Sequence, residues 1–162
     1  MNRLLPPLLG LAVLLAGCAT NRLSDAERLS LYRANAGAPV RHFQYFNRLS
    51  GWTALGDSAL AVWTRPNQAY LLELSGRCMD LDFAPSIAIT HFGSRVSARF
   101  DDVIVFGGSS RTIRLPCRIQ SVRPLDVKAL RMSEKELREA KMQARAEQAP
   151  DEKAADENAP DE

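Results

Sequence analysis

Between His42 and Pro124, short runs of β-prone residues follow one another with few residues between them. The runs read GWTAL, ALAVW, AYLLEL, IAITHF, RVSARF, DVIVF, TIRL and CRIQSV. Strands at this spacing, with no helices between them, are typical of an antiparallel meander that forms a sandwich or a partly closed barrel. We therefore predict a mainly β (α+β) fold built on a small antiparallel sheet.

The run RVSARF has the clearest alternation. It predicts that Val96, Ala98 and Phe100 face the core, while Arg95 and Arg99 face the other way.

Turn signals separate the runs. RPNQ at 65–68 places proline at the second turn position and predicts a hairpin that joins Trp63 to Ala69. GGSSR at 107–111 predicts a second hairpin loop. The segment Ala84–Ile89 could be a strand or a short helix, and the sequence leaves both open.

A short helix is expected before the β region. Ser24 and Glu27 have the spacing of a capping box, in which each side chain binds the backbone N–H of the other. The helix should run from about Asp25 to Asn35, with Leu29 and Tyr32 on one face. Its basic side chains could lie near lipid headgroups or simply face solvent.

A second helix is expected after the β region, although residues 126–130 could already start a helical turn. Ser133 and Glu136 form another capping box, so the sequence predicts an exposed helix at 132–148. Residues 147–162 hold seven acids and one lysine. The segment 149–162 has no large apolar residue, which predicts a disordered acidic tail.

The first residues form an apolar run that ends in Leu15, Ala16, Gly17 and Cys18. The run is too short and too interrupted by proline to be a stable membrane span. Small residues just before a cysteine resemble the lipobox of bacterial lipoproteins. The resemblance implies cleavage before Cys18 and acylation of that residue, which would anchor the chain in a membrane. In that family, alanine at position 19 implies the outer membrane, on the side that faces the periplasm.

These expectations divide the chain into five parts. They are a signal peptide (1–17), a lipidated tether with a short helix (18–37), a disulfide-bonded β domain (38–131), an exposed helix (132–148) and a disordered tail (149–162).

Two cysteines remain once Cys18 is assigned to the lipid. In an oxidising compartment Cys78 and Cys117 are most simply a disulfide. A reactive thiol is the alternative, but the chain has no C-x-x-C motif and no histidine close by in sequence to lower the pKa of either thiol.

Asp80 and Asp82 are the weak candidates for a metal site. On a strand, residues two apart face the same side, and carboxylate oxygens suit calcium or magnesium. Leu81 and Phe83 would then alternate with them as buried residues. A solvated strand face is the plainer reading, and His42 and His91 alone do not make a zinc site. We therefore expect no metal and no cofactor.

Arginines recur on the later strands. If these strands pair, they form a basic face that could bind phosphate or carboxylate groups. The alternative is internal pairing with Asp80, Asp82 and Asp102. The candidate anion-binding residues are Arg95, Arg99, Arg114 and Arg118, with Arg111 and Arg123 nearby in the pattern.

Three short motifs extend the resemblance. W-x-x-L-G-D at 52–57, T-R-P-N at 64–67 and R-P-L-D at 123–126 resemble an uncharacterised family of small Gram-negative lipoproteins, over about residues 41–131. The resemblance implies a β-rich domain with two cysteines and implies no known activity.

No G-x-S-x-G elbow is present, so the pattern of a serine hydrolase is missing. We expect a non-enzymatic binding or interaction module of the cell envelope, with a protein, glycan or anionic lipid as partner and no nucleic acid. A periplasmic hydrolase, or an inhibitor of an exogenous hydrolase, is the alternative.

Overall fold

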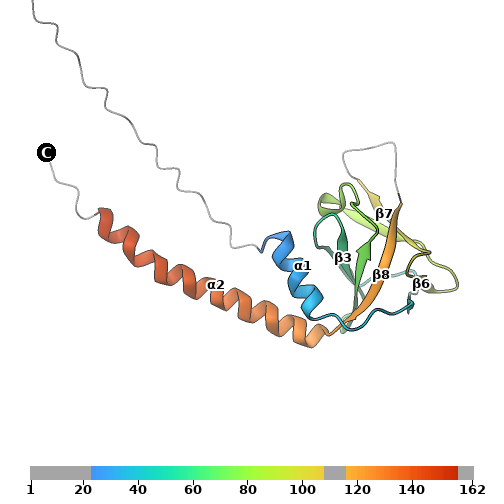
Figure 1. Ribbon diagram of the computed structural model, residues 1–162, viewed down its shortest axis with the longest axis horizontal. Coiled ribbons are helices and arrows are strands. Elements are labelled where there is room, and N and C mark those ends of the chain that lie inside the picture. The colour runs from blue at the N-terminus through green and yellow to red at the C-terminus, as the bar shows by residue number, and fades with distance from the viewer. Residues whose placement is uncertain (1–22, 108–115, 157–162) are drawn as a thin grey trace, which may run out of the picture.

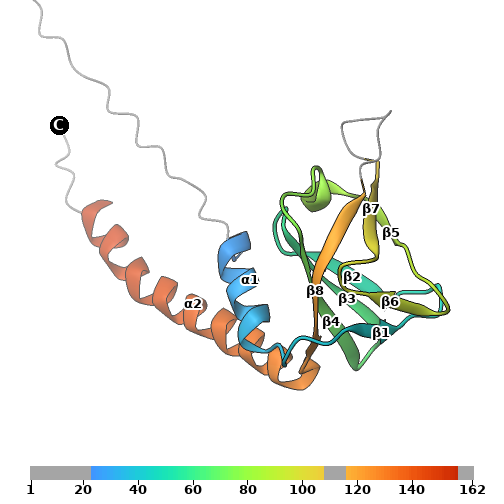
Figure 2. The same cartoon turned by 45° about the vertical axis from the view of Figure 1, so that its right-hand side comes forward.

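The computed structural model describes residues 23–107 and 116–156, with side chains described as far as residue 147. Its core is an antiparallel sheet that curls into a half-barrel, with two helices on one side (Figures 1 and 2). The fold is mainly β, as predicted. The elements are α1 (Asp25–Ala34), β1 (His42–Gln44), β2 (Gly51–Ala54), β3 (Ala59–Arg65), β4 (Gln68–Leu74), the 3₁₀ helix η1 (Leu81–Phe83), β5 (Ser86–Ile89), β6 (Arg95–Ser97), β7 (Asp102–Phe106), β8 (Cys117–Leu125) and α2 (Val127–Asp156).

Six strands form the main sheet in the order β2-β3-β4-β8-β7-β5, and β1 pairs with β6 in a separate two-stranded ribbon. The β3–β4 hairpin is the one that RPNQ predicts: Trp63 pairs with Ala69, and Arg65 pairs with Gln68. The open question over Ala84–Ile89 is settled in favour of a strand, since β5 pairs with β7 over its whole length. The loop predicted at 107–111 lies mostly outside the described residues.

The inner face of the half-barrel holds the larger of two hydrophobic clusters. Phe43 and Tyr45 from β1 and the residue after it, and Val96 from β6, pack there against residues of the main sheet such as Leu60 and Leu72. The ribbon of β1 and β6 therefore covers the inner face, on the side away from the helices (Figure 2). Burying large aliphatic and aromatic side chains on this face is the main stabilising term of such a domain.

The outer face carries the second cluster. Small side chains at Ala59, Ala61 and Ala69 let α1 and the start of α2 approach β3 and β4 closely. Tyr32 of α1 lies edge-on to Trp63, with 6.4 Å between the ring centroids. β3 is thus buried on both faces, which explains its unbroken apolar run.

Helix α1 begins as its sequence predicts. The Glu27 backbone N–H donates to the Ser24 hydroxyl at 3.3 Å, and the Ser24 N–H donates to the Glu27 carboxylate at 2.8 Å. The Ser24 backbone N–H, together with its hydroxyl, holds the pKa of Glu27 below its ordinary value. Tyr32 is buried and Leu29 packs beside it, so the predicted apolar face is confirmed.

The C-terminal helix differs from the prediction. α2 starts at Val127 rather than near residue 132, and the Asp126 carboxylate accepts the Ala129 N–H at 2.9 Å at its beginning. Leu130 is buried in the outer cluster and fixes this first turn. The Ser133–Glu136 spacing therefore lies inside a helix, because a helix that is already nucleated upstream propagates at little cost.

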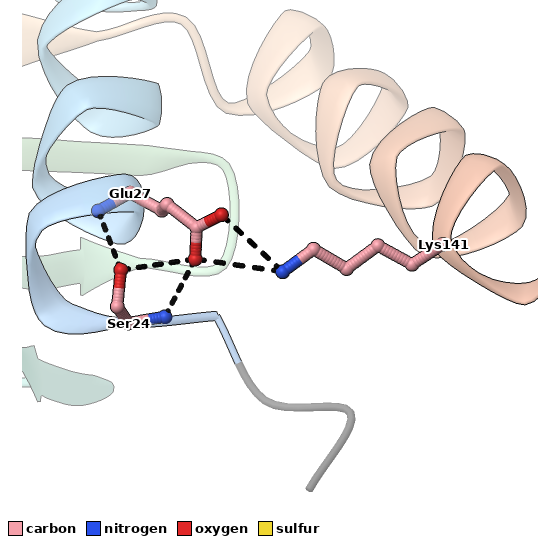
Figure 3. Close-up of polar contacts among 3 residues, drawn as sticks. All are labelled: Ser24, Glu27 and Lys141. Atoms are coloured by element: carbon pink, nitrogen blue, oxygen red, sulfur yellow. Dashed lines mark hydrogen bonds and ion pairs between the residues drawn. The ribbon is translucent and has the colours of Figure 1, made fainter. Parts of the chain in front are cut away.

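The same helix extends into the segment that the sequence assigns to a disordered tail, since α2 reaches Asp156. Alanine, glutamate, lysine and glutamine favour helix, and the composition therefore supports propagation. The first half of α2 contacts α1. The Tyr32 hydroxyl donates to the Glu134 carboxylate at 3.2 Å. The Lys141 ammonium lies 3.4 Å from the Glu27 carboxylate (Figure 3). Beyond Lys141 the described side chains are exposed.

Two predicted core residues are exposed instead. β6 ends at Ser97, and the following turn places Arg99 at a φ of 70° and leaves Phe100 78% exposed. Phe83 is 85% exposed because it ends a 3₁₀ helix rather than continuing a strand. In both places a turn breaks the alternation on which the prediction depends. In the described part of the chain, no helix is both long and apolar enough to cross a membrane.

Candidate functional site

The disulfide predicted between Cys78 and Cys117 is present. It joins the segment before η1 to the first residue of β8, with 5.6 Å between the Cα atoms. Cys78 is fully buried in the inner cluster, next to Leu81 and Ile119. Both thiols are consumed by this bond, so the reactive-thiol alternative does not describe the structure.

The two aspartates after Cys78 do not share a strand face. Asp80 lies in a turn with a φ of 62°, and Asp82 belongs to η1. The same-face prediction is wrong, because the disulfide and the turn end the strand at Leu74. Among the described residues no three acid, histidine or cysteine side chains are grouped as metal ligands would be.

The arginines of the later strands are distributed over two sheets. Arg95 lies on β6 in the small ribbon, whereas Arg118 lies on β8, where its Nε is 3.1 Å from the Asp102 carboxylate. Arg123 donates to the backbone carbonyls of Ala36 and Gly37.

Backbone contacts bring one more of these arginines toward β8. The Arg99 N–H donates to the Ile119 carbonyl, and the Arg118 guanidinium donates to the Phe100 carbonyl. Arg111, Arg114 and the lipidation candidate Cys18 lie outside the described residues.

A cleft of about 810 Å³ lies where both helices approach the free edge of β2. We call it the helix–edge cleft. Trp52 of β2 and Phe83 of η1 supply aromatic rings. Its charged side chains come from α1, η1 and α2: Asp25, Arg28, Asp82, Glu134 and Arg138. A volume of this size, with aromatic walls and a few polar groups, is typical of ligand sites.

Among the described residues, the charges of the helix–edge cleft are only partly compensated. The Arg28 guanidinium donates to Asp25 at 2.6 Å, but its buried Nε has no partner among the described residues. Burial raises the pKa of Asp82, and the negative charge of Asp25 raises it further, whereas the Gly56 backbone N–H lowers it. In this cleft Asp82 can accept a hydrogen bond from a ligand, and the exposed guanidinium of Arg138 can donate one.

Sequence patterns alone did not find this cleft. Trp52 packs partly against the inner cluster and also lines the cleft. The sequence offers Asp82 only as a weak metal candidate. The other charged side chains of the cleft come from α1 and α2, which are far from Asp82 in sequence. Only the exposed Phe83, next to an acid, carried a local signal, and the alternation pattern assigned it to the core.

The fold and the cleft define a small disulfide-bonded β domain whose helices and sheet edge enclose a charged, aromatic groove. The chain belongs to a family of unknown function (DUF6491), whose model matches residues 1–141. No curated protein and no solved structure matches the chain.

Proposed function

We propose that this protein is a lipid-anchored envelope lipoprotein that binds an envelope glycan without catalysing a reaction. The observation that carries the proposal is the helix–edge cleft. The anchor at Cys18 and the periplasmic face of the outer membrane rest on the lipobox resemblance. The disulfide between Cys78 and Cys117 supports the same location, because such bonds persist in oxidising compartments.

The chemistry of the cleft favours a glycan that carries charged groups. The exposed ring of Phe83 and the partly exposed ring of Trp52 offer flat apolar surfaces to sugar rings. Asp82 and Glu134 can accept hydrogen bonds from hydroxyl or amino groups, and Arg138 can bind a carboxylate. Peptidoglycan, which combines sugar rings with free amino and carboxyl groups, has all of these features.

Cosedimentation of the full chain with purified peptidoglycan sacculi, in a neutral detergent, tests this proposal. We expect the protein to sediment with the sacculi. The variants Phe83→Ala and Asp82→Asn should bind about tenfold more weakly, as the loss of one good contact implies. Both side chains are exposed, so neither change should unfold the protein. Phe92→Ala, which removes a similarly exposed ring outside the cleft, is the matched control.

Equal binding by the wild type and both cleft variants would contradict the assignment of the glycan to this cleft. Release of soluble fragments from the sacculi by the wild type, but not by Asp82→Asn, would instead favour the hydrolase alternative. In that case the raised pKa of Asp82 would make it the candidate proton donor.

The anchor has a separate test. The intact mass of the protein extracted from membranes should exceed that of residues 18–162 by the acyl groups, and Cys18→Ser should abolish this increase. An unmodified Cys18 in membrane extracts would contradict the lipid anchor and leave the glycan proposal standing.

A further inference from the structure

A second cleft, of about 380 Å³, lies where β1 meets the β3–β4 hairpin. We call it the arginine cleft. Its side chains include Gln44, Phe46, Arg48, Thr64, Arg65 and Gln68. It shares no residue with the helix–edge cleft, so a ligand of the arginine cleft is independent of the proposed glycan.

The arginine cleft has two guanidinium groups and no carboxylate in its lining. Over residues 23–107 and 116–147, neither Arg48 nor Arg65 has a hydrogen bond or an ion pair through its side chain. This differs from Arg28, Arg33, Arg77 and Arg118, each of which contacts a carboxylate. Two guanidinium groups at one concave site, with no carboxylate of the described residues beside them, create a positive potential that attracts an anion.

A β-bulge places Arg65 at the cleft. Trp63 pairs with Ala69 and Arg65 pairs with Gln68, so Thr64 is an extra residue in β3. Bulges of this kind turn side chains away from the regular alternation, and here Thr64 and Arg65 both line the cleft although they are neighbours in sequence.

The polar side chains beside the arginines are held in place. The Thr64 hydroxyl donates to the Gln68 side-chain carbonyl at 3.2 Å, and the Gln68 amide donates to the Tyr70 hydroxyl at 2.9 Å. On the opposite wall, Asn47 has a φ of 57° and turns the chain between Phe46 and Arg48.

A third arginine adds to the positive charge of this end of the hairpin. Arg131 of α2 donates to the carbonyl of Pro66, the residue after Arg65. Its guanidinium is thereby kept near the tip of the hairpin, where it strengthens the potential without lining the cleft.

We propose that the arginine cleft binds a phosphate ester. Guanidinium groups match the geometry of phosphate oxygens and bind them through paired hydrogen bonds, and two such groups can hold one phosphate from two sides. The side chain of Phe46, which lines the same cleft, is 64% exposed and gives the site an apolar rim. A phospholipid headgroup and a soluble phosphate ester both present the required group, and the rim favours a ligand that also has an apolar part.

The test uses the full chain in neutral detergent micelles and follows the NMR signals of the arginine side-chain N–H groups. Glycerol 3-phosphate is one probe, and phosphatidylglycerol added to the micelles is the other. We expect the Arg48 and Arg65 signals to shift on addition of either probe. The variants Arg48→Ala and Arg65→Ala should each bind at least about tenfold more weakly, because a hydrogen bond to a charged group is among the strongest polar contacts.

Arg41→Ala/Arg145→Ala is the matched control, since it removes two exposed positive charges outside the cleft. It should bind as the wild type does, whereas Arg48→Ala/Arg65→Ala should not bind. An equal loss in both double variants would overturn the proposal by showing that only net charge matters. The absence of any shift with either probe would overturn it as well.

Phe46→Ala distinguishes the two sources of the phosphate group. Weaker binding of phosphatidylglycerol, with unchanged binding of glycerol 3-phosphate, supports a lipid as the ligand. Unchanged binding of both probes supports a soluble ester. Either result is compatible with a phosphate site at the two arginines.

Discussion

The inner face of the six-stranded sheet is covered by strands and a disulfide, whereas the outer face is covered by two helices. On the inner face, large side chains such as Leu60 and Leu72 meet the β1–β6 ribbon, and Cys78 is bonded to Cys117. On the outer face the sheet presents alanines, and α1 and α2 are held by Tyr32, Leu130 and a few polar contacts.

From this difference we expect the outer side of the sheet to change its conformation more easily than the inner side. On the inner side, a covalent bond joins the segment before η1 to β8 of the main sheet, across 39 residues of sequence. The outer cover depends on contacts that mutation or acid can remove singly. Both helices line the helix–edge cleft, so these walls should respond to changes that leave the inner cluster intact. Four predictions test this contrast.

Cys117→Ser should have one of the largest effects. It should lower the free energy of unfolding by about 4 kcal/mol, because the unfolded chain regains the entropy that a closed loop of this length removes. Chemical denaturation measures the loss. A reducing agent should have the same effect on the wild type and none on the variant. A loss below about 1 kcal/mol would show that the inner face does not depend on the bond.

Leu72→Ala and Leu71→Ala compare the two faces directly. The two residues are neighbours on β4, both fully buried, and they face the inner and the outer cluster, respectively. Each change should cost about 2–5 kcal/mol in the free energy of unfolding. We expect the larger cost for Leu72→Ala, because the inner cluster includes the disulfide between Cys78 and Cys117, whereas the helices on the outer face can move into a cavity more easily.

The same denaturation experiment decides between the two faces. If Leu71→Ala is the more costly change, the helical cover is the more rigid of the two and the contrast is reversed. Hydrogen exchange should show faster exchange in α1 and α2 for Leu71→Ala than for Leu72→Ala.

Tyr32→Phe should cost about 1.5 kcal/mol, because it removes a part-buried hydrogen bond to the carboxylate of Glu134. Burial, and then the neighbouring Glu134, raise the pKa of Tyr32 far above its ordinary value, so the hydroxyl stays protonated at all working pH values. Tyr45→Phe on the inner face is the control, and thermal denaturation should detect almost no change for it. Equal costs for the two variants would contradict the role of the Glu134 contact.

Glu73→Gln should have the smallest effect, and one that depends on pH. Burial works against ionisation of Glu73, but hydrogen bonds from Ser121 and Arg33 outweigh it and lower the pKa of Glu73 below its ordinary value. Because the pKa of Glu73 is lower in the folded state than in the unfolded chain, its ionised carboxylate stabilises the fold at pH values above the unfolded pKa. This contribution is lost as the pH falls through the folded pKa. The wild type should therefore exceed the variant in stability near neutral pH, and the difference should shrink in acid.

Glu136→Gln, at an exposed site on α2, is the control for this measurement. Its stability should follow that of the wild type at every pH. A constant difference between the wild type and Glu73→Gln across the acid range would show that the Arg33 contact does not hold α1 through its charge.

Local patterns explain which parts of the fold the sequence predicted. The α1 capping box and the β3–β4 hairpin each depend on residues within a few positions of one another, so their signals survive in any tertiary context. The disulfide followed from the number of cysteines together with the expected compartment. Where a turn interrupts a strand, as before Phe83 and Phe100, the alternation no longer reports which side is buried.

The two clefts could not be predicted in this way. Asp82 lies in one cleft with Arg28 and Glu134 only because α1, α2 and η1 converge at the free edge of β2. Arg48 and Arg65 belong to different segments of the pattern, and a bulge brings Arg65 to the cleft. The sequence predicted an anion-binding face from arginines at alternate positions of the later strands. One of them, Arg118, is paired with Asp102 in the structure.

By itself, the sequence determined the class of fold, the first helix, the β3–β4 hairpin and the pairing of Cys78 with Cys117, because these depend on short-range patterns or on simple counting. The tertiary structure was needed to show which charged side chains of the described residues have no partner there and which of them share a cleft. Those properties depend on distances between residues that are far apart in the chain, and such distances are fixed by packing on the two faces of the sheet.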